Sequence, residues 1–164
     1  MKYAALILLL LGFHAEAKIV DNAKAVETYR KQLEETKLIF QDTQQTLIDS
    51  APVFEMYQAL GYTTPEVIAI SKRYLALEER TKKLYGENLI LNPTPFNYCA
   101  TLPSVAYSLW MQRIDSVKRE NTSAVNSLAQ SYIKQGKECV DSIKNPPPEH
   151  LEENDDVQII DIDN

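Results

Sequence analysis

The sequence predicts an all-α protein: an elongated three- to four-helix bundle with a short helical insertion and a disordered acidic C-terminal tail. Glycine occurs only four times in 164 residues, and hairpins or bulged strands need glycine where φ is positive. No stretch of the body alternates apolar and polar residues as a half-buried strand does, whereas apolar residues recur at helical spacing. Helices with such apolar stripes bury them against one another in one core.

The first seventeen residues are typical of a secretory signal peptide. Lys2 precedes an apolar run at 3–13, and Ala15-Glu16-Ala17 is a small-residue cleavage site. The alternative is an uncleaved membrane anchor, but this run is about half as long as the ~20 residues that a bilayer core needs. We therefore expect an exported chain that begins at Lys18 and works in the periplasm, at the cell surface or outside the cell. Only an uncleaved signal would attach it to the membrane.

Without the signal, 1–17, the chain consists of a body at 18–145 and a tail at 146–164, which is enough for one domain. The tail holds seven acids and no Lys or Arg, whereas the body holds sixteen basic and fifteen acidic residues. The basic residues are scattered among acids and form no stripe, so we expect no nucleic-acid partner. The acidic composition of the tail, which begins with three prolines, favours disorder.

The first long helix is expected from Asp21 to about Ser50, with Asp21 or Asn22 as its N-cap and Pro52 after its end. Two seams run along it at intervals of seven residues. One seam is apolar and the other is largely polar: Val26, Leu33, Phe40 and Leu47, and then Tyr29, Thr36, Thr43 and Ser50. This pattern suits a helix that packs along a bundle and is too weak for a free two-stranded coiled coil. A short helical insertion should follow at 53–60.

The second helix has the clearest start and end in the sequence. Thr64 suits the N-cap, Pro65 suits the first turn, and Gly86 can end the helix in a left-handed conformation. The apolar positions between them lie at helical spacing: Val67, Ile70, Tyr74, Leu77 and Leu84. Gly61 should likewise close the short insertion that precedes this helix.

Residues 87–103 contain three prolines and are expected to form the longest loop of the body. A helical pattern then runs from Ser104 to Lys144, and its apolar periodicity lapses at 119–123. Trp110 lies in this pattern and is expected in the core.

Cys99 and Cys139 are the only cysteines, and in an exported protein such a pair is usually bridged. A disulfide needs Cα atoms within about 7 Å, whereas a straight helix would carry Cys139 roughly 50 Å from its start. We therefore expect a break near 120–123, with Thr122 or Ser123 as the cap of a second helix. The resulting hairpin would bring the two cysteines together. The alternatives are a continuous helix with free thiols and a bridge between molecules.

Chemical signatures are sparse in the sequence. His14 lies in the signal and His150 in the tail, so the body contains no histidine. This excludes histidine-based triads and zinc sites built on histidine, and no glycine-rich phosphate loop occurs. Adjacent acids such as Glu34 and Glu35 point in different directions on a helix and suit a solvated face. We therefore assign no catalytic, cofactor-binding or metal-binding residue and expect a protein that is not an enzyme and has no cofactor.

Two groups of residues are candidates for binding a partner. Phe96 and Tyr98 lie in the proline-rich loop, where no helix face buries them automatically. The tail contains an apolar, β-prone run flanked by acids, with Ile159, Ile160 and Ile162. Such a run would suit addition of a strand to the edge of a partner's sheet. The alternative is that the tail is disordered and has no such role.

Two stretches of the body, Ile19-Val20-Asp21-Asn22-Ala23-Lys24 and the Gln- and Glu-rich run at 32–45, carry a family resemblance. With the signal and the long first helix, they resemble the minor pilus subunits of bacterial type IV secretion and conjugation systems, over about residues 18–145. The resemblance implies an elongated helical bundle with a smaller appendage, located at the pilus tip. It also implies a contribution to pilus assembly and to adhesion to the recipient cell.

The function expected from the sequence is therefore that of an exported, non-enzymatic protein that works through protein contacts. Its partners would be pilus or secretion-channel subunits. The alternative is a soluble periplasmic or secreted effector, chaperone or inhibitor. Such a protein would bind its target through the proline-rich loop or the acidic tail.

Overall fold

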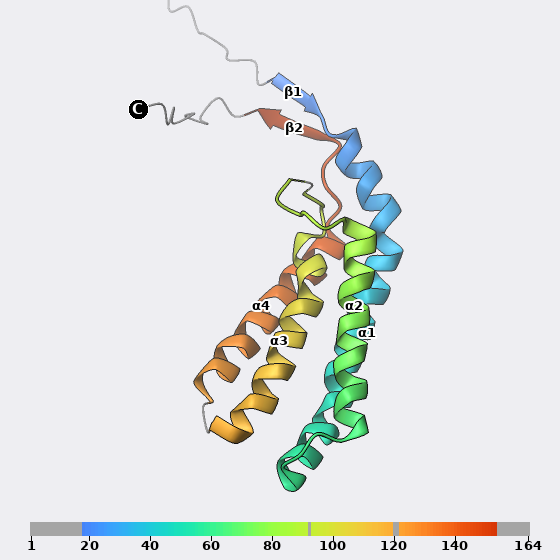
Figure 1. Cartoon of the computed structure of the whole chain (residues 1–164). Coiled ribbons are helices and arrows are strands. Elements are labelled where there is room, and N and C mark those ends of the chain that lie inside the picture. Colours follow the sequence, from blue (N-terminus) through green and yellow to red (C-terminus); the bar gives the residue numbers. More distant parts are fainter. Residues whose placement is uncertain (1–17, 92, 120–121, 154–164) are drawn as a thin grey trace, which may run out of the picture.

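Four helices and two short strands make up the part of the chain that the computed structural model describes, which is residues 18–91, 93–119 and 122–153. In chain order they are β1 (Lys18–Asp21), α1 (Ala23–Leu60), α2 (Pro65–Tyr85), α3 (Asn97–Arg119), α4 (Ser123–Lys144) and β2 (His150–Glu153). Helices α1, α2 and α3 pack against one another, and α4 packs mainly on α3. The result is an elongated bundle with the strands at one end (Figure 1). The predicted all-helical class is confirmed.

Helix α1 runs without interruption through Pro52, so the predicted boundary at this residue was wrong. Pro52 is exposed, and the helical turn after it carries Tyr57, which is 1% exposed in the core. Burial of that turn offsets the backbone hydrogen bond that proline cannot donate. The predicted end at Gly61 is confirmed, since Gly61 adopts φ 73° and its N–H donates to the Tyr57 carbonyl at 2.9 Å.

The fully buried side of α1 is its largely polar seam. Five residues at intervals of seven lie on it, and each is at most 7% exposed: Tyr29, Thr36, Thr43, Ser50 and Tyr57. The small Thr and Ser side chains satisfy their hydroxyls within the helix; for example, Thr43 donates to the Ile39 carbonyl at 2.7 Å. Short side chains with internally bonded hydroxyls let the neighbouring helices approach closely. In the apolar seam of the same helix, Val26 is buried, whereas Leu33, Phe40 and Leu47 are half-buried.

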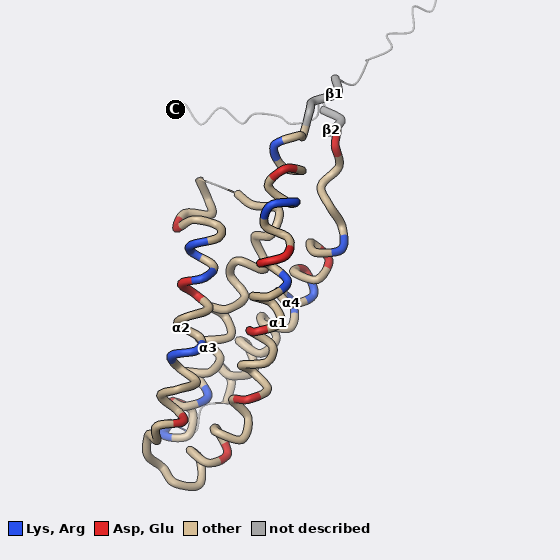
Figure 2. Tube along the Cα trace, turned by 90° about the vertical axis from the view of Figure 1, so that its right-hand side faces the viewer, with Lys and Arg blue, Asp and Glu red and all other residues tan. Residues whose placement is uncertain are grey.

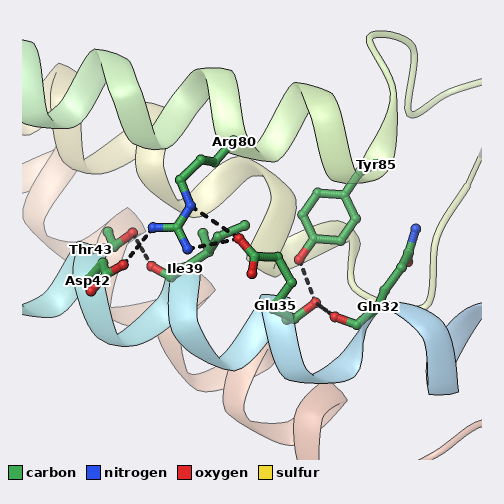
Figure 3. Close-up of polar contacts among 8 residues, drawn as sticks. Gln32, Glu35, Ile39, Asp42, Thr43, Arg80 and Tyr85 are labelled. Atoms are coloured by element: carbon green, nitrogen blue, oxygen red, sulfur yellow. Dashed lines mark hydrogen bonds and ion pairs between the residues drawn. The ribbon is translucent and has the colours of Figure 1, made fainter.

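Charged side chains fix the register of α1 against α2. The Arg80 guanidinium donates to the carboxylates of Glu35, at 2.8 Å, and Asp42, at 2.6 Å (Figure 3). One helical turn after Arg80, the Tyr85 hydroxyl lies 2.7 Å from the Thr36 hydroxyl. These contacts pair two acids that lie seven residues apart on α1 with the antiparallel α2, so a slip of one turn would separate all of them.

Ionisation of Tyr85 and Tyr132 is expected to destabilise the fold at high pH. Burial raises the pKa of each phenol to about 12, above the ~10 of an unfolded chain. The contribution of each neutral phenol to folding is therefore complete below pH ~10 and is lost as the pH rises towards 12. Denaturant titrations at pH 9 to 12, with tyrosinate absorbance as a second probe, would measure this loss. Tyr85→Phe should flatten the dependence, and an equally steep dependence in that variant would contradict the assignment.

One part of the core is built around Trp110, as predicted. Trp110 is 1% exposed, and its indole N–H donates to the Ser71 hydroxyl at 2.9 Å. It packs with buried residues of all three central helices, namely Tyr57, Val67, Ile70, Tyr74, Leu77 and Ala106. Four of these belong to the apolar stripe predicted for the second helix, whose start at Pro65 is also confirmed.

The second part of the core contains the disulfide between Cys99 and Cys139, whose Cα atoms are 4.7 Å apart. Both cysteines are at most 1% exposed and pack with Tyr29, Phe96 and Tyr85. Helix α3 ends at Arg119 and α4 begins at Ser123 after Thr122. The predicted hairpin and intramolecular bridge are therefore confirmed.

Helix α3 begins at Asn97, seven residues earlier than predicted, so Pro103 lies inside a helix. The start has reciprocal contacts similar to those of a capping box, between Thr94 and the first residues of the helix. The Thr94 hydroxyl accepts from the Phe96 N–H at 3.3 Å, and the Asn97 side chain accepts from the Thr94 N–H at 3.0 Å. Thr94-Pro95 thus repeats the signal of Thr64-Pro65 at the start of α2.

Strands β1 and β2 join the two ends of the described chain. They pair antiparallel, with Lys18 opposite Glu153 and Asp21 opposite His150. The pairing continues at Asn22, whose backbone N–H donates to the Glu149 carbonyl at 3.0 Å. β2 falls within the segment 146–164, so the prediction of disorder throughout that segment was wrong for His150–Glu153. Backbone pairing with β1 is the physical reason. The signal at 1–17 lies outside the described residues.

Candidate partner-binding groove

An open groove of about 460 Å³ lies between α1 and α4. Its apolar lining comes from both helices: Phe40 of α1, and Tyr132, Ile133, Gly136 and Val140 of α4. Its polar lining consists of Gln44, Lys137 and Asp141. Together these residues define the α1–α4 groove. It combines an apolar floor with a few polar groups, as binding sites do.

The groove exists because α1 and α4 each leave an apolar stripe partly uncovered. The polar seam of α1 faces the core, which turns Phe40 towards α4. Helix α4 is amphipathic, yet Cys139 is its only fully buried described residue. Ile133 is 49% exposed, and Tyr132 and Val140 are half-buried. A surface helix normally buries such a stripe against its own core, so this one has room for a further element.

Gly136 opens the middle of the groove. A Cβ atom built at this position would have no atom within 4 Å other than those of its own helix backbone and chain neighbours. Glycine in a helix interior costs about 0.5 to 1 kcal/mol relative to alanine. A larger side chain would fit at this position, so close packing within the chain does not explain why a residue that destabilises the helix is found there.

Gly136→Ala is therefore expected to raise the free energy of unfolding by about 0.5 to 1 kcal/mol. Equilibrium denaturation in urea would measure the change. Gly61→Ala is the matched control, because Gly61 has φ 73° and alanine there should destabilise. A loss of stability in Gly136→Ala would show that the position is more crowded than the structure has it.

One face of α4, which borders the groove at Lys137 and Asp141, carries three lysines and one acid. Lys134, Lys137, Asp141 and Lys144 follow one another on α4 at spacings of three and four, so they share a face. Among the residues that the structure describes, none of these four side chains forms an ion pair. Elsewhere on the helices Lys and Arg mix with Asp and Glu (Figure 2). The groove is therefore apolar in its floor, and the charges of the two ionisable residues that line it, Lys137 and Asp141, cancel.

The structure places the partner-binding residues predicted from the sequence in different environments. Phe96 is fully buried and stacks on Tyr29 with ring centroids 4.9 Å apart, so its expected role as a surface contact was wrong. The contacts at the start of α3 place it in the core instead. Tyr98 is 47% exposed on the first turn of α3 and stays a candidate. Ile159, Ile160 and Ile162 lie outside the described residues.

The loop before α3 presents a second apolar surface. Ile90 is 93% exposed and Leu91 is 75% exposed. The Asn88 side chain accepts from both of their N–H groups, at 3.1 Å each, which gives the loop tip a defined turn. At its base the Thr94 hydroxyl donates to the Gln32 side chain of α1 at 2.6 Å. The loop is thus anchored and displays two aliphatic side chains to solvent.

Sequence reasoning missed the α1–α4 groove, although two signals for it were present: the apolar seam through Phe40 and a glycine in the middle of an amphipathic helix. No protein-family model, curated protein or solved structure matches the chain. Of the described helices, none has the length and apolar character needed to span a bilayer. The geometry of the groove is therefore the basis for the functional argument.

Proposed function

We propose that this chain is an exported, non-enzymatic protein that acts by binding another protein in the α1–α4 groove. The observation that carries the proposal is the uncovered apolar stripe of α4 opposite Phe40, in a bundle that a buried disulfide braces. Grooves between two helices commonly accept an amphipathic segment through its apolar anchors. The disulfide favours an oxidising compartment and so supports export.

In its narrower form, the proposal makes the chain a minor component of a bacterial type IV secretion or conjugation pilus. Its support is the resemblance at 19–24 and 32–45 together with an elongated bundle whose long first helix starts soon after the expected cleavage site. Pilus or secretion-channel subunits would be the partners. The periplasm or the cell surface would be the place of contact.

The test uses Ile133→Glu, which puts a charge into the groove at a position already 49% exposed, and Leu75→Glu as the matched control on α2, 44% exposed. The tagged full-length chain and both variants are purified from envelope fractions and their bound proteins are identified. We expect defined partners with the wild type and the control, and about a tenfold weaker association with Ile133→Glu. Equal capture by all three would rule out the groove. Partners unrelated to pili or secretion channels would rule out the narrower form.

The alternative function is that of a soluble effector, chaperone or inhibitor that binds its target through the proline-rich loop. The exposed pair Ile90 and Leu91 on an anchored turn favours it. Replacing both by aspartate would discriminate the two candidates. Loss of partner capture in this variant, with normal capture by Ile133→Glu, would identify the loop as the binding surface.

A further inference from the structure

We infer that the tip of the loop between α2 and α3, formed by Ile90 and Leu91, contacts the surface of a lipid bilayer. The inference rests on the export that we propose for the chain and does not depend on the α1–α4 groove. The sequence predicts attachment to a membrane only through an uncleaved signal. The loop tip is a second point of attachment, at the boundary between the headgroups and the acyl chains.

The exposure of the tip is the first argument. Ile90 is 93% exposed and Leu91 is 75% exposed, so these neighbouring aliphatic side chains have little contact with the core of their own chain. Transfer of such side chains from water to an apolar environment is favourable. The turn at Asn88 holds them together at the tip, so little conformational freedom is lost when they enter a bilayer.

The backbone of the tip is the second argument, and it favours a bilayer over a protein strand. The Asn88 side chain accepts hydrogen bonds from the N–H groups of Ile90 and Leu91, at 3.1 Å each. Pro93 and Pro95, which follow, have no N–H to donate. A bilayer interior offers no partner to a free N–H, so a tip whose donors are bonded internally suits it. A strand added by a protein partner would need those donors.

The place of the loop in the fold is the third argument. Leu91 lines a pocket together with residues at the start of α1, namely Asn22, Lys24 and Ala25. The loop therefore lies at the end of the bundle where β1 and α1 begin (Figure 1). The apolar run at 3–13 precedes β1 in the sequence by only a few residues. A membrane that holds this run lies at the same end of the bundle as the loop tip.

The expected contact is weak by itself. Two aliphatic side chains bury less apolar surface than one myristoyl chain, and a myristoyl chain alone gives only reversible binding to a membrane. When the N-terminus is also attached, the second contact becomes intramolecular and the two reinforce each other. Because the tip contributes apolar side chains and no charge, salt should not weaken its contribution.

The first test measures binding to neutral phosphatidylcholine vesicles that contain a small share of nickel-chelating lipid. The chain from Lys18 onwards carries an N-terminal histidine tag, which takes the place of the apolar run. We expect the variant with Ile90→Asp and Leu91→Asp to bind these vesicles at least about tenfold more weakly than the wild type in cosedimentation. This difference should be the same at low and high salt.

A matched pair on the flank of α2 is the control. Ile68 and Leu75 are the same two residue types, and they are 48% and 44% exposed. The variant with Ile68→Asp and Leu75→Asp should bind the tagged vesicles as the wild type does. Circular dichroism would check that both double variants remain helical. Equal binding of the loop variant and the wild type would overturn the inference, and so would a difference that disappears at high salt.

The second test locates the end of the bundle that meets the lipid. Leu91→Trp places a fluorophore at the loop tip, and Tyr62→Trp places one between α1 and α2, at the opposite end (Figure 1), where Tyr62 is 60% exposed. Lipids brominated on their acyl chains should quench the tagged Leu91→Trp chain and leave the tagged Tyr62→Trp chain unchanged. Trp110 is buried and gives the same background in both. Equal quenching of the two chains would contradict the inference.

These outcomes are separate from those that test the proposed function. Ile133→Glu should bind the vesicles as the wild type does, whatever its effect on protein partners. If the loop variant binds vesicles normally but loses its protein partners in the envelope fraction, the loop binds protein and the lipid contact is wrong. If the loop variant loses vesicle binding while Ile133→Glu keeps all its partners, the lipid contact stands and the proposed groove is ruled out.

Discussion

Replacing Cys99 and Cys139 together by alanine is expected to lower the free energy of unfolding by about 4 kcal/mol. The bridge closes a loop across a sequence separation of 40 residues. In the chain-entropy model, closing a loop of this size lowers the conformational entropy of the unfolded chain and so raises its free energy by about 4 kcal/mol. It also fixes the start of α3 against the last turns of α4, beside Phe96 and Ile143. Urea denaturation of the oxidised wild type and the double variant would measure the difference.

Reduction of the wild type is the control for this experiment. It should reproduce most of the loss, while the double-alanine variant should not respond to reductant. The groove residues of α4 depend on the same hairpin, so we expect weaker partner capture in the reduced protein. A double variant that unfolds at the same urea concentration as the oxidised wild type would show that the helical packing alone holds α3 and α4 together.

Trp110→Ala is expected to cost about 3 to 5 kcal/mol, because it leaves a cavity where α1, α2 and α3 meet. The variant also leaves the Ser71 hydroxyl without the indole donor. Trp110→Phe keeps most of the volume and should cost less, since only part of the ring and one hydrogen bond are lost.

Met111→Ala is the neighbouring control. Met111 is 44% exposed on the same helix, so its truncation should change stability by no more than about 0.5 kcal/mol. Thermal and urea unfolding followed by circular dichroism would compare the variants. Similar losses at both positions would mean that Trp110 does not occupy the junction of the three helices.

Signals that are local or covalent made much of the fold predictable from the sequence. Thr64-Pro65 and Gly61 marked helix ends by their backbone preferences, and the cysteine pair required the hairpin of α3 and α4. Pro52 misled the prediction because its effect on the backbone is local, whereas the burial of Tyr57 that outweighs it is tertiary.

The start of α3 was predictable in principle and was missed. Thr94-Pro95 carries the same start signal as Thr64-Pro65, but three prolines in 87–103 favoured a loop. Because 87–103 was predicted as a loop, Phe96 was also predicted at the surface. A residue just before a helix start can instead point into the core. The ring of Phe96 stacks on Tyr29, a contact between segments far apart in the sequence.

The groove was beyond prediction from the sequence for a geometric reason. Both seams of α1 were visible, but which of them faces the core depends on how closely α2 and α3 approach. Short hydroxyl side chains such as Thr36 and Thr43 allow the closest approach and so occupy the core. The apolar seam through Phe40 then remains for α4, which covers it only in part.

The pairing of β1 with β2 has a consequence for the order in which the molecule is completed. Under the proposed export, a chain that crosses a membrane from its N-terminus delivers β1 first and β2 after all four helices. β1 therefore waits without its partner strand until the rest of the chain has arrived, and the hydrogen bonds of Asn22 to Pro148 and Glu149 form last. The strand pair can therefore form only after all four helices have been delivered.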